Sequence, residues 1–183
     1  MKALLLLIAA LPLTAAETVF NLDPAQTTVA FTLHDVLHTV HGTFKLKRSA
    51  LHFDPETNKA AGEIIVDVAS GDSGSQGRDK RMHKEILESK KFPEASFVPD
   101  RVEGKLAPDG PSELDFHGQF SIHGASHEMT LHFHVEGKAG QYTGSSHFVI
   151  PYVQWGMKNP SNFLLKVDDK VDLDLKVAAR LAP

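Results

Sequence analysis

Cysteine is absent from the 183-residue chain, which excludes disulfides, thiolate metal sites and a cysteine nucleophile. No apolar run approaches the roughly 20 residues of a membrane-spanning helix, so the pattern argues against an integral membrane protein. The formal net charge is −4, without the basic excess that is typical of nucleic-acid-binding proteins. Tryptophan occurs once and tyrosine twice, whereas phenylalanine occurs eleven times. The length favours a single folded domain with a core of its own.

The N-terminus has the pattern of an export signal. Lys2 provides a positive start, and an apolar run follows over residues 3–11. Thr14 and Ala16 then place small residues at the −3 and −1 positions of a cut after Ala16. A buried N-terminal helix is the alternative. We expect a signal peptide of sixteen residues and one domain over 17–183, located in the periplasm or secreted.

Most of the remaining chain alternates apolar and polar residues, which is typical of strands with one apolar face. The clearest segments are 29–33, 114–123, 129–136, 146–150 and 171–177, and less regular candidates are 42–47, 50–53, 63–69 and 95–106. About eight antiparallel strands in one domain predict an all-β sandwich or barrel. Closure into a barrel removes exposed strand edges, and an eight-stranded barrel can hold one small ligand. The alternation alone does not choose between the two.

One segment, residues 76–91, lacks this alternation. Met82, Ile86 and Leu87 recur there at helical spacing among charged residues, which predicts one amphipathic α-helix over about 76–91. The short link at 124–127 joins two of the best strands and predicts a hairpin.

Motifs of common catalytic sites are absent from the sequence. The letters GDSG at 71–74 resemble the nucleophile turn of trypsin-like proteases, but that chemistry also needs a histidine base, a buried aspartate and an oxyanion hole. The chain is too short for the two barrels that carry them, and a flexible Gly/Ser loop explains the letters. Nothing in the sequence argues for an enzyme.

Histidine is unusually frequent, with eleven residues. His132 and His134 share one face of a predicted strand. If hairpin partners sum to about 251, His117 faces His134 and Gln119 faces His132. Cross-strand neighbours lie about 5 Å apart, close enough to share a transition metal. A metal site of His117, His132 and His134 is therefore one alternative, and a solvated outer face is the other.

Phenylalanine concentrates on the apolar faces of the predicted strands. Five examples are Phe31, Phe116, Phe120, Phe133 and Phe148. Composition does not separate a packed core from a lined cavity, because both place aromatic side chains inside.

Six segments carry a recognisable pattern in order along the chain. They are NLDPAQTTVAFTLH (21–34), VHGTF (40–44), HFDPETNKAAGEIIVDVASGDSG (52–74), Arg78-Asp79, FPEASF (92–97) and FHGQFSIHGASHEMTLHFHVEG (116–137). Each is weak alone, but the ordered set covers nearly the whole chain from Asn21 onward and resembles the YceI family of exported lipid-binding proteins.

The resemblance implies an extended, lipocalin-like, eight-stranded antiparallel β-barrel with a helix at one side. It also implies a non-enzymatic protein that holds a polyisoprenoid, an isoprenoid quinone or another long-chain lipid, with no other cofactor, and it leaves a homodimer open. The lipid tail is expected inside the barrel. The residues expected to line it are Phe31, Leu33, Phe116, Phe120, Ile122, Leu131, Phe133, Phe148, Ile150 and Trp155.

The head group of the lipid is expected, by the same resemblance, at Arg78, Asp79 and His83. An arginine fork can bind a phosphate or carbonyl, and an adjacent aspartate can orient it. The alternative is that the Arg-Asp pair only pins the helix. Two departures leave the head group open: Arg81 stands where many members have histidine, and PYVQWGMKNPSNFLL (151–165) stands where many have Arg-Asp-Phe-Gly.

Overall fold

The computed structural model describes residues 18–54 and 57–181, so the predicted signal peptide lies outside the described residues. The described part contains nine strands and one helical segment. They are β1 (Thr18–Leu22), β2 (Thr28–His34), β3 (Thr39–Phe53), β4 (Ala60–Asp72), α1 (Gln76–Arg81) with the π-helical turn η1 (Met82–Ile86), β5 (Glu94–Gly104), β6 (Gly110–Ile122), β7 (Ala125–Lys138), β8 (Gln141–Ile150) and β9 (Val171–Leu181).

The strands form one antiparallel sheet that closes on itself. The order is β1-β3-β2-β9-β8-β7-β6-β5-β4, and the pairing of β3 with β4 closes the barrel. Phe20 in β1 and Phe31 in β2 each pair with one residue of β3 and one of β9, so these two strands share a single place in the wall. Nine strands therefore give the eight positions that were predicted, and the all-β barrel is confirmed.

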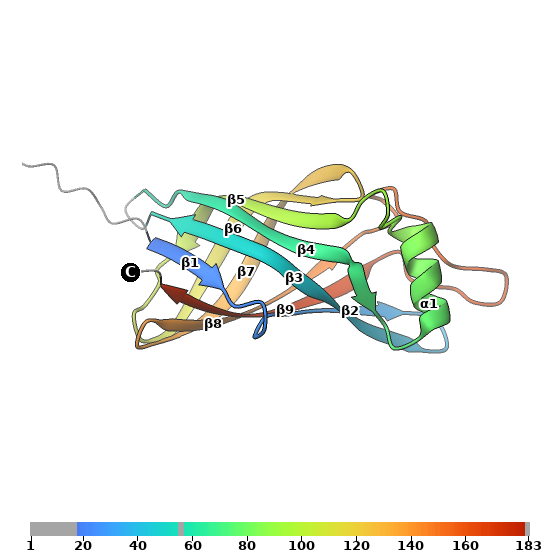
Figure 1. The fold of residues 1–183 in the computed structure, drawn as a ribbon, viewed down its shortest axis with the longest axis horizontal. Coiled ribbons are helices and arrows are strands. Elements are labelled where there is room, and N and C mark those ends of the chain that lie inside the picture. The colour runs from blue at the N-terminus through green and yellow to red at the C-terminus, as the bar shows by residue number, and fades with distance from the viewer. Residues whose placement is uncertain (1–17, 55–56, 182–183) are drawn as a thin grey trace, which may run out of the picture.

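The barrel is elongated, with α1 across one end and the last residues of β9 at the other (Figure 1). We refer to these as the helix end and the far end. A connection without strands, residues 151–170, joins β8 to β9 at the helix end. Neither helical segment of the described residues has the length and apolar character needed to cross a bilayer.

Alternation along each strand sorts side chains between the inside and the outside. In β7, Leu131, Phe133 and Val135 are only 2%, 6% and 8% exposed, whereas His132 and His134 between them are exposed. Successive residues of a strand point to opposite faces, so the apolar set of every strand faces one common interior.

The hairpin between β6 and β7 is tighter than the sequence predicts. Only His123 and Gly124 connect the strands, with φ of 53° and 79°, and Ile122 pairs with Ala125. Two consecutive residues of positive φ are typical of a two-residue hairpin turn. Paired positions therefore sum to 247, and the expected sum of about 251 was wrong. A histidine in the left-handed region is uncommon, and the letters alone did not indicate it.

The helical segment is shorter than the predicted α-helix over 76–91. Regular α-helix ends at Arg81, and the following turn is π-helical, with the Leu87 N–H donating to the Met82 carbonyl at 2.9 Å. Glu88 then adopts a φ of 45°, which ends the helix. The predicted apolar face is nevertheless confirmed, because Met82, Ile86 and Leu87 all face the barrel interior.

Candidate ligand-binding site

An apolar cavity of about 160 Å³ lies inside the barrel at the helix end. The helical segment contributes Met82, Ile86 and Leu87 to its wall, and the 151–170 connection contributes Tyr152 and Met157. The strands contribute the remaining wall, which includes the aromatic side chains Phe31, Phe44, Phe97, Phe120 and Phe148. The helix and the connection thus complete a chamber that the strands alone leave incomplete.

Few polar groups face this chamber. The polar lining residues are Thr27, Ser96 and Tyr152. The Tyr152 hydroxyl donates to the Asp168 carbonyl at 2.7 Å, and burial raises the pKa of Tyr152 to about 12, so this phenol stays neutral. The Thr27 hydroxyl is buried without a hydrogen-bond partner among the described residues. A wall of this kind favours hydrocarbon over any solute that must keep its hydrogen bonds.

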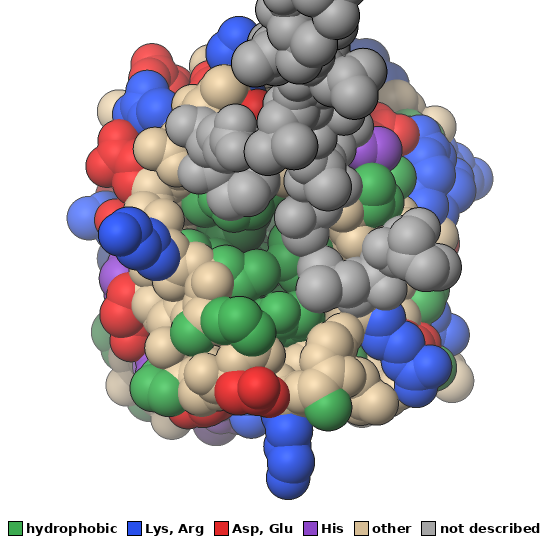
Figure 2. Space-filling model, turned by 90° about the vertical axis from the view of Figure 1, so that its left-hand side faces the viewer, with side chains coloured by type: hydrophobic (Ala, Val, Ile, Leu, Met, Phe, Trp, Pro, Cys, Tyr) green, Lys and Arg blue, Asp and Glu red, His purple; other side chains and the backbone are tan. Residues whose placement is uncertain are grey.

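A second apolar cavity, of about 70 Å³, continues the first toward the far end. The two cavities share Leu22, Ile64, Phe97 and Val177 as lining residues. Hydrophobic side chains are visible in the middle of the far end (Figure 2). The interior is therefore a long apolar space divided by only a few shared side chains.

Nine of the ten residues predicted to line the interior do so. The first cavity includes Phe31, Leu33, Phe120, Ile122, Leu131, Phe148 and Ile150, and the second includes Phe116 and Phe133. Trp155 lines neither. Its indole stacks on the imidazole of His127, with ring centroids 3.8 Å apart and planes 6° apart, and lies 5.9 Å from the Phe120 ring. Contact of these residues with a ligand remains a prediction.

Arg78 and Asp79, predicted at the head group, both bind Ser73, which directly follows β4. The Arg78 guanidinium donates from Nε to the Ser73 hydroxyl and from Nη2 to its carbonyl, each at 2.7 Å. The Asp79 carboxylate accepts the Ser73 N–H at 3.0 Å and also its hydroxyl. Burial would raise the pKa of Asp79, but the Ser73 hydrogen bonds and the charges of Arg78 and His83 hold it below its usual value.

His83, the third predicted head-group residue, contacts the end of β4. Its Nε2 lies 2.8 Å from the Gly71 carbonyl, and because a carbonyl only accepts, Nε2 carries the hydrogen. Its Nδ1 is buried without a hydrogen-bond partner among the described residues. None of Arg78, Asp79 and His83 lines either cavity. The structure thus places them where they anchor the helix, and head-group binding remains a prediction.

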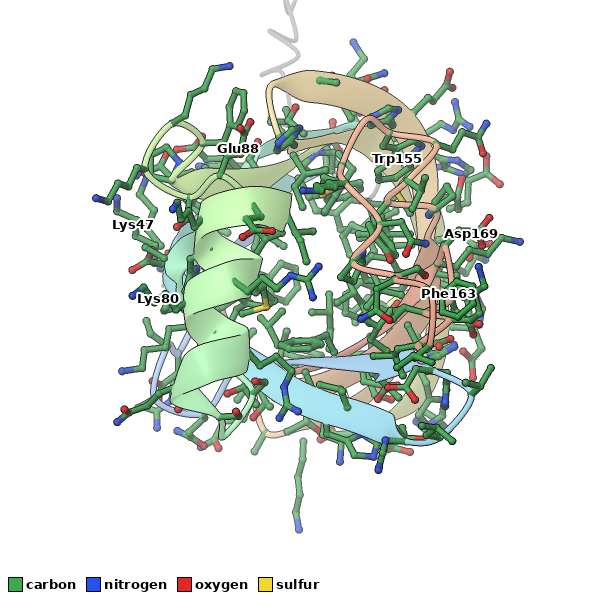
Figure 3. The ribbon with its side chains drawn as sticks, turned by 90° about the vertical axis from the view of Figure 1, so that its right-hand side faces the viewer. Lys47, Lys80, Glu88, Trp155, Phe163 and Asp169 are labelled. Carbon is green, nitrogen blue, oxygen red and sulfur yellow. The ribbon has the colours of Figure 1, made fainter. Side chains whose placement is uncertain are left out.

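The mouth of the first cavity includes polar contacts between the helix and the 151–170 connection. Arg81 Nη2 donates to the Pro160 carbonyl at 3.2 Å, and Lys158 Nζ lies 3.7 Å from Glu85. Figure 3 looks onto this end, with α1 on one side of the opening and the connection that carries Trp155 on the other. Glu85 and Pro160 carry no signal in the sequence, because contacts between residues more than 70 positions apart leave no local pattern.

Comparison with known proteins assigns the chain to a family. The model of the YceI-like domain matches residues 20–179. The chain belongs to the YceI family. No curated protein sequence matches the chain significantly.

Solved structures share the YceI barrel at low sequence identity. BcnA of Burkholderia cenocepacia is 19% identical with a TM-score of 0.72, covering 86% of this chain and 98% of that one. A polyisoprenoid binding domain from Saccharophagus degradans is 15% identical with a TM-score of 0.70, covering 89% and 98%. The YCEI protein of Campylobacter jejuni is 19% identical with a TM-score of 0.60, covering 74% and 81%. At these identities the likeness concerns the fold.

The three histidines of the alternative metal site lie on the outer face of β6 and β7, but they are not arranged as a shared set of metal ligands. Because the turn has two residues, His117 pairs with Thr130, and its Nδ1 lies 2.7 Å from the Thr130 hydroxyl. His132 and His134 face carboxylates instead, and no group of three or more histidine or acidic residues in the described ranges is arranged to hold a metal ion. The predicted pairing of His117 with His134 was wrong.

His132 and His134 form a row of ion pairs on the outer wall. His132 Nδ1 lies 2.6 Å from Asp115, and His134 Nδ1 lies 2.6 Å from Glu113. The hydrogen bond with Asp115 raises the pKa of His132, and the hydrogen bond with Glu113 raises that of His134. The hydrogen bond with His134 in turn lowers the pKa of Glu113.

These shifts predict a pH window for the contribution of the row to stability. The ion pairs of His132 and His134 stabilise the folded state fully below the usual histidine pKa of 6.5. This stabilisation is lost as the pH rises through the raised pKa values of the two histidines. Glu113 contributes above its usual 4.5 and loses the contribution as pH falls through its lowered value. The double variant H132N/H134N should therefore lose more melting temperature, relative to the wild type, at pH 5.5 than at pH 8.5. The effect is small because the pairs are exposed.

Thermal melts of both proteins at the two pH values test this prediction. Lys138→Gln, which removes an exposed cation from the same strand, is the control and should show no such pH dependence. An equal loss at both pH values would mean that the histidines contribute packing rather than charge.

Proposed function

We propose that this YceI-family protein is an exported, non-enzymatic binding protein that holds a long-chain amphiphile in its barrel. The observation that carries the proposal is that two apolar cavities lie next to each other inside the barrel and share four lining residues. A compact ligand would fill one of them, whereas a chain of repeated apolar units can extend through both. The ligand class is a polyisoprenoid, with an isoprenoid quinone as the alternative.

The energetics favour a long hydrocarbon tail. Each buried CH₂ contributes about 0.8 kcal/mol, so a chain of several isoprene units can be retained without any polar contact. The scarcity of polar groups in the wall removes the partners that a sugar, nucleotide or peptide would require. The polyisoprenoid binding domain with the same fold supports this ligand class.

Export and domain organisation belong to the same proposal. The pattern of the first sixteen residues supports cleavage after Ala16, with residues 17–183 as the single binding domain. The destination is the periplasm or the exterior. Catalysis has no support from the sequence motifs, and bound lipid is the one ligand that the proposal requires.

Native mass spectrometry of the protein purified from its export compartment tests the proposal. We expect a discrete hydrophobic adduct on a chain that begins at Glu17, and organic extraction then identifies the lipid. The same spectrum distinguishes a monomer from a homodimer. A bare protein mass, even after incubation with polyisoprenoids and isoprenoid quinones, would contradict the proposal.

A further inference from the structure

Four large apolar side chains at the helix end are the most exposed of their kind among residues 19–54 and 57–180. They are Phe163 at 96%, Leu164 at 83%, Leu37 at 69% and Val36 at 66%, and we call them the apolar tip. The next most exposed, Val98 and Val149, reach only 44% and 43%. Single exposed apolar residues are ordinary, but four that gather at one place mark an interaction site.

The apolar tip is built from two turns whose shape does not depend on its own side chains. The Asp35 carboxylate accepts the N–H groups of Leu37 and His38, each at 2.7 Å. The Asn162 side-chain oxygen accepts the N–H of Leu164 at 2.9 Å and the next N–H at 2.8 Å. Turn apices normally carry polar residues or glycine. The turns do not require large apolar residues at their apices, so these side chains indicate a role other than shaping the turn.

Backbone contacts hold the two turns side by side. The Val36 N–H donates to the Lys166 carbonyl at 3.2 Å, and the Asp168 N–H donates to the His34 carbonyl at 3.0 Å. The 151–170 connection projects beyond the strands at the helix end (Figure 1). Phe163 lies across the opening from α1 (Figure 3). The apolar tip is thus a protrusion beside the mouth of the first cavity.

Positive charge lies on the other side of the same mouth. Residues 76–91 contain six Lys or Arg and three Asp or Glu, in a chain whose net charge is −4. Lys80 is exposed on this segment. A protruding apolar tip beside a cationic segment is complementary to an anionic lipid surface, since apolar groups enter the interface and cations contact the head groups.

We propose that the apolar tip is the surface with which the protein docks onto a lipid bilayer, with the cavity mouth toward the membrane. Docking would serve the proposed lipid-binding function by bringing the cavity mouth to the membrane. The docking itself does not require a lipid bound in the barrel. A bilayer is favoured over a protein groove because the tip is convex and combines with a separate cationic surface.

Flotation with vesicles tests the docking. The probes are vesicles of phosphatidylcholine with one quarter phosphatidylglycerol, and vesicles of phosphatidylcholine alone. We expect the wild type to float with the mixed vesicles, and the variant V36S/L37S/F163S/L164S to lose at least tenfold in partitioning. The control V98S/V149S removes exposed apolar residues from strand walls and should stay within twofold of the wild type. All three proteins carry the same N-terminus, so the contrast isolates the tip.

Two further measurements separate the outcomes. Circular dichroism and melting establish that the quadruple variant is folded, and flotation is repeated with delipidated protein. Flotation without any retained lipid would keep the docking while contradicting the proposed function. Equal flotation of the wild type and the quadruple variant would overturn the docking, as would a wild type that stays with neither vesicle. A wild-type dimer that the quadruple substitution makes monomeric, without flotation, would overturn it in favour of a second copy of this chain.

Discussion

Ala95→Phe is expected to leave the barrel folded but unable to retain a lipid. Ala95 is 7% exposed, lies on β5 and lines the first cavity. A larger side chain in a packed core costs about 1–3 kcal/mol because its neighbours must move. Here the added ring enters a cavity of about 160 Å³, so it takes free volume and gains contacts instead. The ring and a lipid tail then compete for one space.

Native mass spectrometry measures whether the variant retains a lipid, and melting of the delipidated proteins measures whether the barrel stays folded. The adduct should disappear, while the free energy of unfolding stays within about 1 kcal/mol of the wild-type value. Ala50→Phe is the matched control, because Ala50 is exposed on β3 and the same ring there leaves the interior unchanged. A folded Ala95→Phe protein that still retains the full adduct would show that lipid does not occupy the first cavity.

The walls of the cavity were predictable from the sequence because of a simple geometric rule. A closed barrel has one inside, and alternation assigns each strand residue to the inside or the outside. Phe120 and Ile122, two positions apart on β6, therefore both line the cavity. Gln119, which directly precedes Phe120, is exposed. Trp155 was beyond this rule, since it lies in a connection where no period relates a residue to a face.

The register and the helix end depend on conformations that local letters do not specify. His123 and Glu88 both adopt positive φ, where glycine is the usual signal, and each ends an element earlier than expected. In the same way, the adjacent Arg78 and Asp79 indicate a charged pair in the sequence, but they do not indicate which residue the two side chains bind. That partner is Ser73 in the folded chain, and its contacts arise from the path of the loop between β4 and α1.

Asp79→Ala is expected to loosen the helix that covers the cavity mouth without changing which lipid is bound. The substitution leaves the N–H and hydroxyl of Ser73 without their acceptor, and Ser73 is only 9% exposed. Loss of hydrogen bonds to a charged group costs about 1.5–3 kcal/mol. Since Met82 and Ile86 follow on the same helical segment and line the cavity, bound lipid should exchange faster.

A double-mutant cycle separates this anchoring role from a head-group role. If Asp79 acts through Ser73, then Ser73→Ala and Asp79→Ala each lower the free energy of unfolding, and the double variant loses clearly less than their sum. Both single variants then exchange a labelled polyisoprenoid faster and still yield the wild-type lipid on extraction. Lys80→Gln, exposed on the same helix, is the control and should match the wild type. Additive losses, with an altered lipid class in Asp79→Ala and Arg78→Ala but not in Ser73→Ala, would instead place the head group at the Arg-Asp pair, because only a direct contact selects the lipid without passing through Ser73.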